Sequence, residues 1–134
     1  MSDREHARLM LRMAGKDLTA LQSMLDTRRF ADEIFGFHAQ QAAEKALKAW
    51  LSLIDVDYPR IHDLEELLAL LVQCGATVPE RFYGLIDLTD FAVQFRYATL
   101  EEEDEPLDRL AVTQQVTELV DYVEQLLTGS EEAE

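Results

Sequence analysis

The sequence is poor in cysteine and in basic residues, and both shortages limit what the protein can be. Cys74 is the only cysteine among 134 residues, which excludes an intramolecular disulfide and a zinc site made of cysteines. We interpret this residue, which follows a leucine-rich segment, as an inert core thiol. Lys and Arg number 12 against 27 Asp and Glu, giving a formal net charge of −15. Such a surface repels phosphate backbones, so nucleic-acid binding through a broad basic face is not expected.

Long apolar runs and targeting segments are missing as well. No run approaches the roughly 18 residues that a membrane span requires. The chain does not open with a basic stretch followed by an apolar one, so we expect a cytoplasmic protein. Its 48% hydrophobic and 29% charged residues are typical of a globular fold, and its length suits a single domain over residues 1–134.

Strand signals and glycine-rich phosphate loops are also absent. Apolar residues recur at helical spacing instead, with Pro and Gly between the periodic segments. The sequence therefore predicts an all-α, up-and-down helical bundle around one core. The expected helices run from a capping pattern at Ser2 and Glu5 to about residue 26, then over about 31–54, 64–74, 79–97 and 106–127.

Two acidic segments lie in the second half of the chain, "EEEDE" at 101–105 and "SEEAE" at 130–134. We expect an acidic loop near 99–106 and a disordered acidic tail near 129–134, with Gly129 ending the last helix. A solvated linker is the simpler interpretation of the loop. Charge complementarity to a basic patch on a partner is the alternative.

The segment "FHAQQAAEKALKAWL" at 37–51 is small-sided on one flank and polar on the other. Its alanines predict close packing in the core, and Glu44 and Lys48 form an i,i+4 ion pair in the favourable order. The polar stripe fits either a solvated face or a surface that meets a ligand or partner. Its members are His38, Gln41, Lys45, Lys48 and Ser52.

This segment, followed by "YPRIHDLEELL" and by "FRYA" at 95–98, resembles the HEPN domain family in order and spacing. The resemblance covers nearly the whole chain. It implies a bundle of four long helices plus one shorter helix, usually assembled as a homodimer. It also implies a minimal nucleotidyltransferase as partner, often in a toxin–antitoxin pair, and the family has been linked to nucleotide binding.

The family also contains metal-independent ribonucleases, whose signature is an Arg, four to six residues, and then a His. None of His6, His38 and His62 has an Arg at that distance, so the ribonuclease role does not carry over by motif. A composite site that joins His62 and Arg96 in a dimer stays open as an alternative. His6 lies outside the matched motifs and is expected at the surface. We expect no metal and no cofactor.

Any nucleotide would have to be held by side chains, and in the matched motifs the candidate phosphate contacts are Lys45, Lys48 and Arg96. His62 is either a capping or packed loop histidine or a ligand-facing one, and Asp63 is a capping or first-turn acid of the third helix. The leading interpretation is a non-catalytic homodimeric partner of a nucleotidyltransferase. The alternatives are a nucleotide-binding domain acting alone and a divergent ribonuclease toxin. The candidate ligand-binding residues are Gln41, Lys45, Lys48, His62, Arg96 and Tyr97.

Overall fold

The computed structural model describes residues 3–26, 28–58, 60–90 and 107–132. The described residues form helices and connections, without a strand among them, which confirms the all-α prediction. The elements are α1 (Asp3–Ser23), α2 (Asp32–Leu53), α3 (Leu64–Gln73), the 3-10 helix η1 (Glu80–Leu88) and α5 (Arg109–Glu132).

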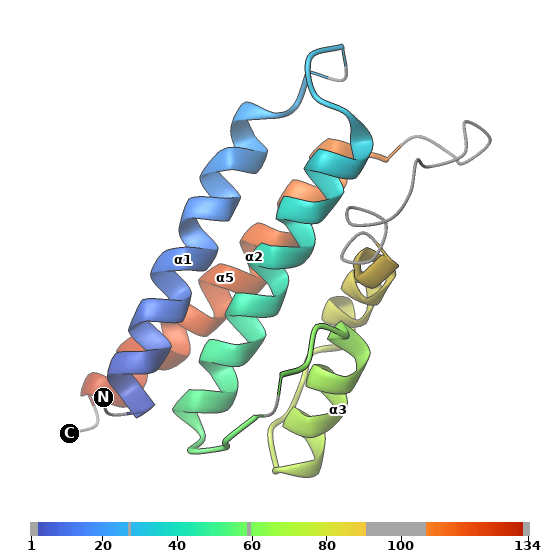
Figure 1. Ribbon diagram of the computed structural model, residues 1–134. Helices are drawn as coiled ribbons and strands as arrows, with labels where there is room; N and C mark the ends of the chain where they lie inside the picture. The colour runs from blue at the N-terminus through green and yellow to red at the C-terminus, as the bar shows by residue number, and fades with distance from the viewer. Residues whose placement is uncertain (1–2, 27, 59, 91–106, 133–134) are drawn as a thin grey trace.

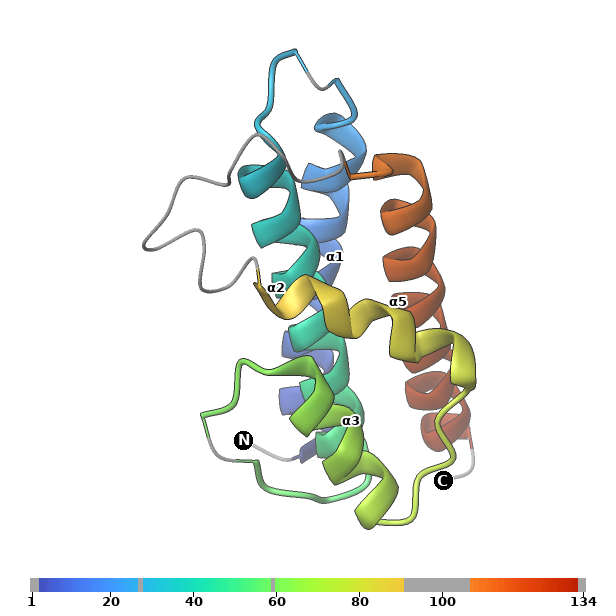
Figure 2. The same cartoon turned by 90° about the vertical axis from the view of Figure 1, so that its right-hand side faces the viewer.

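The three long helices α1, α2 and α5 lie side by side along the bundle (Figure 1). In the orthogonal view, η1 crosses over α2 and α5, and α3 lies against α2 below it (Figure 2). Both ends of the chain lie at the same end of the bundle. Because α2 contacts all the other described elements, it is the central helix of the fold.

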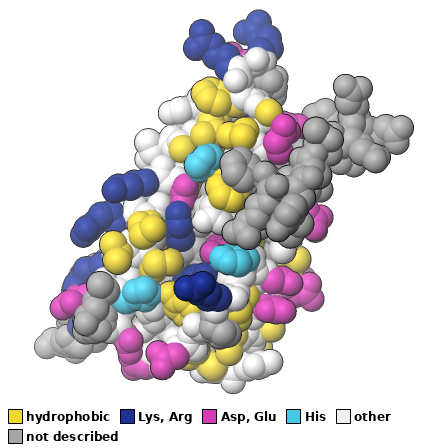
Figure 3. All heavy atoms as spheres, in the orientation of Figure 1, with side chains coloured by type: hydrophobic (Ala, Val, Ile, Leu, Met, Phe, Trp, Pro, Cys, Tyr) yellow, Lys and Arg dark blue, Asp and Glu magenta, His cyan; other side chains and the backbone are white. Residues whose placement is uncertain are grey.

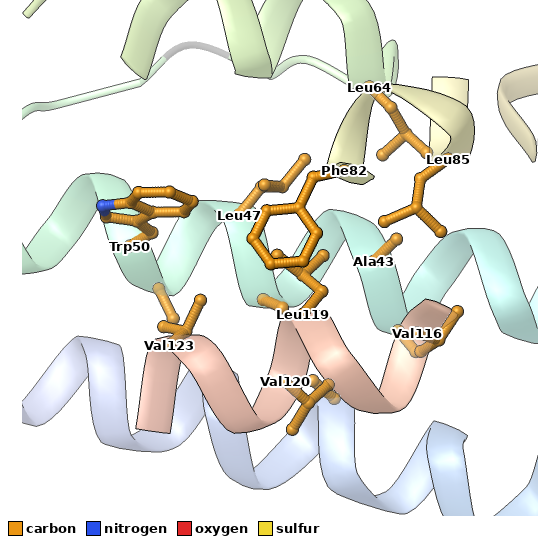
Figure 4. Packing of buried hydrophobic residues seen from close by; sticks show 14 of the residues in the cluster. Ala43, Leu47, Trp50, Leu64, Phe82, Leu85, Val116, Leu119, Val120 and Val123 are labelled. Atoms are coloured by element: carbon orange, nitrogen blue, oxygen red, sulfur yellow. The ribbon is translucent and has the colours of Figure 1, made fainter. Parts of the chain in front are cut away.

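The central position of α2 follows from its alanines, five of which are fully buried. Small side chains let α1 approach closely, while larger residues fill the space toward the other helices. Figure 4 shows Leu47 and Trp50 of α2 facing Leu119 and Val123 of α5, with Phe82 of η1 between them. Burying each such side chain contributes about 1.5–3 kcal/mol to folding.

Both α2 and α3 are followed by a residue with a positive φ. After α2, the backbone N–H of Val56 donates to the carbonyl of Leu51 over 3.0 Å, and Asp55 takes a φ of 60°. After α3, Gly75 takes a φ of 97°, a left-handed conformation for which glycine is suited. At its start, α3 is capped by Asp63, whose carboxylate accepts from the N–H of Glu65 at 2.9 Å. The predicted role of Asp63 is confirmed.

The fourth helix differs from its predicted form. The helix expected over 79–97 begins at Glu80, but its first nine residues form a 3-10 helix. Its sequence, "ERFYGLIDL", is rich in aromatic, β-branched and glycine residues with weak α-helical preference. Residues 91–97 and the acidic loop near 99–106 lie outside the described residues, as does Ser2 of the expected N-terminal cap.

The last helix begins later and ends later than predicted. The Asp108 side chain accepts from the N–H of Ala111 at 3.0 Å, so α5 starts after Asp108 and not at Pro106. It then runs through Gly129 to Glu132, past the end that was predicted at Gly129. Glycine inside a helix costs only about 1 kcal/mol. A hydrogen bond of 2.8 Å from Arg4 Nη2 to Ser130 Oγ ties this end of α5 to α1.

Cys74 was predicted to be a core thiol, and this is wrong, because its residue is exposed. It is the C-cap of α3 and lies three residues after the last of the buried leucines, Leu67, Leu68 and Leu71, that face the core. Among the described helices, none is both long and apolar enough to cross a membrane.

Candidate functional site

A buried polar row runs along α2 at intervals of four residues, and it consists of Gln40, Glu44, Lys48 and Ser52. Such spacing places the four side chains on one face of the helix. The interpretation of the polar stripe as a solvated face is therefore wrong for Lys48 and Ser52, which are buried. The reason is the connection from α2 to α3, whose half-buried residues Val56, Tyr58 and Ile61 pack against the core beside this row.

Glu44 is the centre of the row, and only 6% of its side chain is exposed. Its Oε1 accepts hydrogen bonds from Gln40 Nε2 at 3.0 Å and from His62 Nδ1 at 3.0 Å. Its Oε2 accepts from Lys48 Nζ at 3.1 Å, which confirms the predicted i,i+4 pair. A buried carboxylate is costly unless it is paired and hydrogen-bonded, and these three donors satisfy it.

His62 is held by α2 at both its ring and its backbone. Its carbonyl accepts from Gln40 Nε2 at 3.1 Å, while its ring reaches Glu44. Because a carboxylate only accepts, Nδ1 carries the proton, and in the neutral ring Nε2 has the free lone pair. The His62 side chain is 55% exposed. It is therefore an oriented imidazole whose outer nitrogen has no hydrogen-bond partner among the described residues and can meet a ligand or a proton donor.

A second part of the site joins α1 to the connection. The Tyr58 hydroxyl lies 2.6 Å from His6 Nε2, so His6, expected at the surface, is half-buried and hydrogen-bonded. Lys48 Nζ lies 5.5 Å from the centre of the Tyr58 ring, within cation–π range. Burial raises the pKa of Tyr58, and the nearby Glu44 carboxylate adds to the rise, while a hydrogen bond with Ser52 acts in the opposite direction.

A third part of the site joins α1 to the middle of α2 through Asp17. Its Oδ2 accepts from Lys45 Nζ at 2.6 Å, and its Oδ1 from His38 Nδ1 at 3.1 Å. Both Lys45 and Asp17 are more than four-fifths buried. Lys45 thus clamps α1 to α2 and is not a solvated side chain.

The predicted ligand-binding residues that the structure describes lie along one side of α2. Figure 3 shows the histidine side chains spread over one face of the molecule, with Lys, Arg and acidic groups between them. Gln41 donates to Gln40 Oε1 at 2.7 Å, and Lys45, Lys48 and His62 each pair with a carboxylate. Arg96 and Tyr97 lie outside the described residues, so the composite pair of His62 and Arg96 stays a prediction.

The sequence did not predict that two carboxylates, Asp17 and Glu44, accept the hydrogen bonds that organise this site. The four-residue spacing of the buried row was the available signal for Glu44. No local sequence pattern distinguishes Asp17 from the exposed acids of the chain, because its partners come from another helix.

Arg109 was also missed, and it is the buried guanidinium at the start of α5. It donates to the carbonyl of Met24 at 2.6 Å, to that of Phe30 at 2.5 Å and to Asp32 Oδ1 at 2.8 Å. The guanidinium also lies over the Phe35 ring at 5.2 Å. Arg109 therefore fixes the turn between α1 and α2 onto α5 and plays a structural part.

A hollow of about 550 Å³ lies at the end of the bundle where the termini meet. A hydrogen bond with Asp55 raises the pKa of Asp3 at its rim, and charge repulsion from Asp55 and Asp57 adds to the rise. Carboxylates so placed disfavour an anionic ligand. The residues that line the hollow are Asp3, Arg4, Glu5, Arg8, Ser52, Leu53, Asp55 and Ser130. The described residues hold no group of three or more His, Cys, Asp or Glu that could bind a metal ion.

Fold and site together define an all-α bundle domain whose central helix carries an internal ion network. The HEPN domain family matches residues 7–132, and the chain belongs to this family. Neither a curated protein nor a solved structure matches the chain.

Proposed function

We propose that the protein is a non-catalytic, homodimeric HEPN partner module that binds a minimal nucleotidyltransferase, as in a toxin–antitoxin-type pair. Its place is the cytoplasm. The observation that carries the proposal is that the lysines of the polar stripe are already neutralised by carboxylates of the same chain. Lys45 pairs with Asp17, and Lys48 pairs with Glu44.

A phosphate is bound best by cations that are accessible and not already neutralised. Neither lysine meets this condition, because each side chain is about four-fifths or more buried and paired with a carboxylate. Moving Lys48 to a ligand would leave the Glu44 carboxylate buried with only two of its three donors, which is unfavourable. The network is therefore suited to holding α1, α2 and the α2–α3 connection together. This favours a binding module with a rigid scaffold over a nucleotide-binding domain acting alone.

The homodimer is what membership of the family implies, and the surface offers apolar groups for it. Large apolar side chains stay exposed in the described part of the chain, including Leu110, Val72 and Tyr83. A second copy that covers such groups would add to stability by removing them from water.

Light scattering after size exclusion tests both parts of the proposal. The purified chain should give about twice its mass of 15.3 kDa. Mixed with the proposed minimal nucleotidyltransferase partner, it should elute earlier with a mass that includes both proteins. A monomer mass overturns the homodimer, and separate elution of the two proteins overturns the partner role.

One observation favours a second candidate, a divergent ribonuclease with a composite Arg/His site. His62 presents an open Nε2 while its Nδ1 is fixed by a buried carboxylate, an arrangement that suits a general base. Lys48, which shares Glu44 with His62, is already paired with that carboxylate, whereas Arg60 is exposed two residues before His62. The Arg–His signature of the family's ribonucleases is absent from the sequence, and for that reason the ribonuclease stays the second candidate.

A further inference from the structure

The outer face of α1 carries basic residues in an otherwise acidic protein. Between Glu5 and Asp17 the helix has Arg8, Arg12 and Lys16 and no acidic residue. Their four-residue spacing places them on one side of the helix, and all three are exposed. Figure 3 shows dark blue Lys and Arg side chains along the edge of the molecule that α1 forms. We call Arg8, Arg12 and Lys16 the α1 ridge.

The ridge belongs to a wider separation of charge along the chain. Residues 1–63 carry nine of the 12 Lys and Arg and ten of the 27 Asp and Glu. Residues 64–134 carry the other three basic residues and seventeen acidic ones. The first half is therefore nearly neutral, and a local basic surface on α1 is not cancelled by its own half of the protein.

Two cations of the ridge are free. Arg12 and Lys16 make no ion pair or hydrogen bond with the described part of the chain. Lys45, Lys48 and Arg109 differ in this respect, because each is bound to a carboxylate. Exposed cations without a partner do not contribute to holding this fold together, so they are available to another molecule.

An apolar row accompanies the ridge. Leu9 and Met13 are 36% and 37% exposed, and they too are four residues apart. Each follows an arginine of the ridge by one position, so the two rows run parallel along α1. Arg and Met are enriched in protein–protein interfaces, where apolar centres are bordered by charged groups.

We propose that the α1 ridge, with Leu9 and Met13, is the surface that docks an acidic amphipathic helix of the partner protein. The inference rests on the proposed function and identifies the surface that the partner uses. Carboxylates four residues apart on the partner helix would pair with Arg12 and Lys16, and apolar groups beside them would cover Leu9 and Met13.

Charge disfavours two other occupants, the same ridge of a second copy and a nucleic acid. The same ridge of a second copy would bring cations against cations, which is unfavourable. A nucleic acid needs more phosphate contacts than two free cations supply, and Leu9 and Met13 offer no aromatic ring on which a base could stack. An acidic protein surface is the occupant that fits both rows.

Isothermal titration calorimetry with the proposed nucleotidyltransferase partner tests the inference. The double variant Arg12→Glu/Lys16→Glu should weaken binding by roughly ten-fold or more, because it places like charges across the interface. Arg28→Glu/Arg29→Glu makes the same change of net charge on exposed residues of the α1–α2 turn and should change the Kd by less than about three-fold. Leu9→Ala/Met13→Ala should weaken binding without changing its salt dependence.

Each outcome has a separate meaning. If the wild-type chain does not bind the nucleotidyltransferase, the proposed function falls, and this inference falls with it. If the wild type binds and both charge-reversed variants weaken binding equally, the proposed function stands and the docking surface is wrong. The docking surface is equally overturned if wild type binds a short single-stranded RNA and Arg12→Glu/Lys16→Glu does not, or if that variant changes the mass of the chain alone.

Discussion

The Nδ1 of His62 lies 3.0 Å from Oε1 of Glu44 and joins an exposed histidine of the α2–α3 connection to a buried carboxylate of α2. The same carboxylate binds Lys48, which is buried beside it. The bond therefore couples the position of a surface imidazole to the internal ion pair of the central helix. This coupling determines how the protein should respond to changes at Glu44.

Glu44→Gln should lower the free energy of unfolding by about 3 kcal/mol. The amide leaves the Lys48 ammonium buried without a counter-charge, and breaking one partner of a buried pair is strongly destabilising. Glu124→Gln, at an exposed position of α5, is the matched control and should stay within about 0.5 kcal/mol. Urea unfolding followed by circular dichroism measures both, and equal effects would show that Glu44 is not buried in the native protein.

Lys45→Ala should cost about 1–3 kcal/mol, because it removes a charge-assisted hydrogen bond to Asp17 between two helices. A solvated lysine would give an effect within about half a kcal/mol. Lys16→Ala, which removes an exposed and unpaired lysine of α1, supplies that reference. Thermal unfolding of the two variants side by side decides between a clamp and a solvated stripe.

Ala46→Leu should destabilise the protein by about 1–3 kcal/mol, because Ala46 is fully buried on α2 and a larger side chain forces its neighbours off their rotamers. Ala69→Leu makes the same change at an exposed position of α3 and should have little effect. A tolerated Ala46→Leu would contradict the close packing of α2 against its neighbours.

Alkaline pH should destabilise the protein through Tyr58. Burial raises the pKa of the folded Tyr58 above its ordinary value of 10.0, so the folded state holds this proton where the unfolded state has released it. The resulting contribution is fully present below pH 10 and is lost as pH rises through the folded pKa. Tyr58→Phe should therefore lose less stability than wild type between pH 9 and pH 11 in urea unfolding. The exposed Tyr83→Phe should follow the wild-type curve, and parallel curves for all three proteins would refute the role of Tyr58.

Much of the fold follows from local patterns. The predicted helix over 31–54 agrees with α2 to within one residue at each end, and the predicted 64–74 agrees equally well with α3. Both succeed because apolar periodicity and end signals coincide: Asp63 caps one helix, and Gly75 follows its end. Where the signals conflict, prediction fails. Gly129 predicts the end of the last helix, yet α5 continues to Glu132, and Ser130 in this added turn binds Arg4 of α1.

The candidate site was only half predictable. The sequence indicated the stripe with Lys45 and Lys48 and the ion pair with Glu44, because these depend on spacing within one helix. Burial of that stripe depends on the α2–α3 connection and on Asp17 of α1, which are distant in sequence. Helical periodicity alone does not contain that information. Arg96 and Tyr97 stay predictions.

The central claim is that this HEPN domain is a binding module whose polar residues are used for its own structure. A ribonuclease assay on the isolated protein with single-stranded RNA tests it most directly. We predict no cleavage above the buffer blank for wild type, and the same result for His62→Ala. Cleavage by wild type that His62→Ala or Arg96→Ala abolishes would contradict the claim and establish a composite catalytic site.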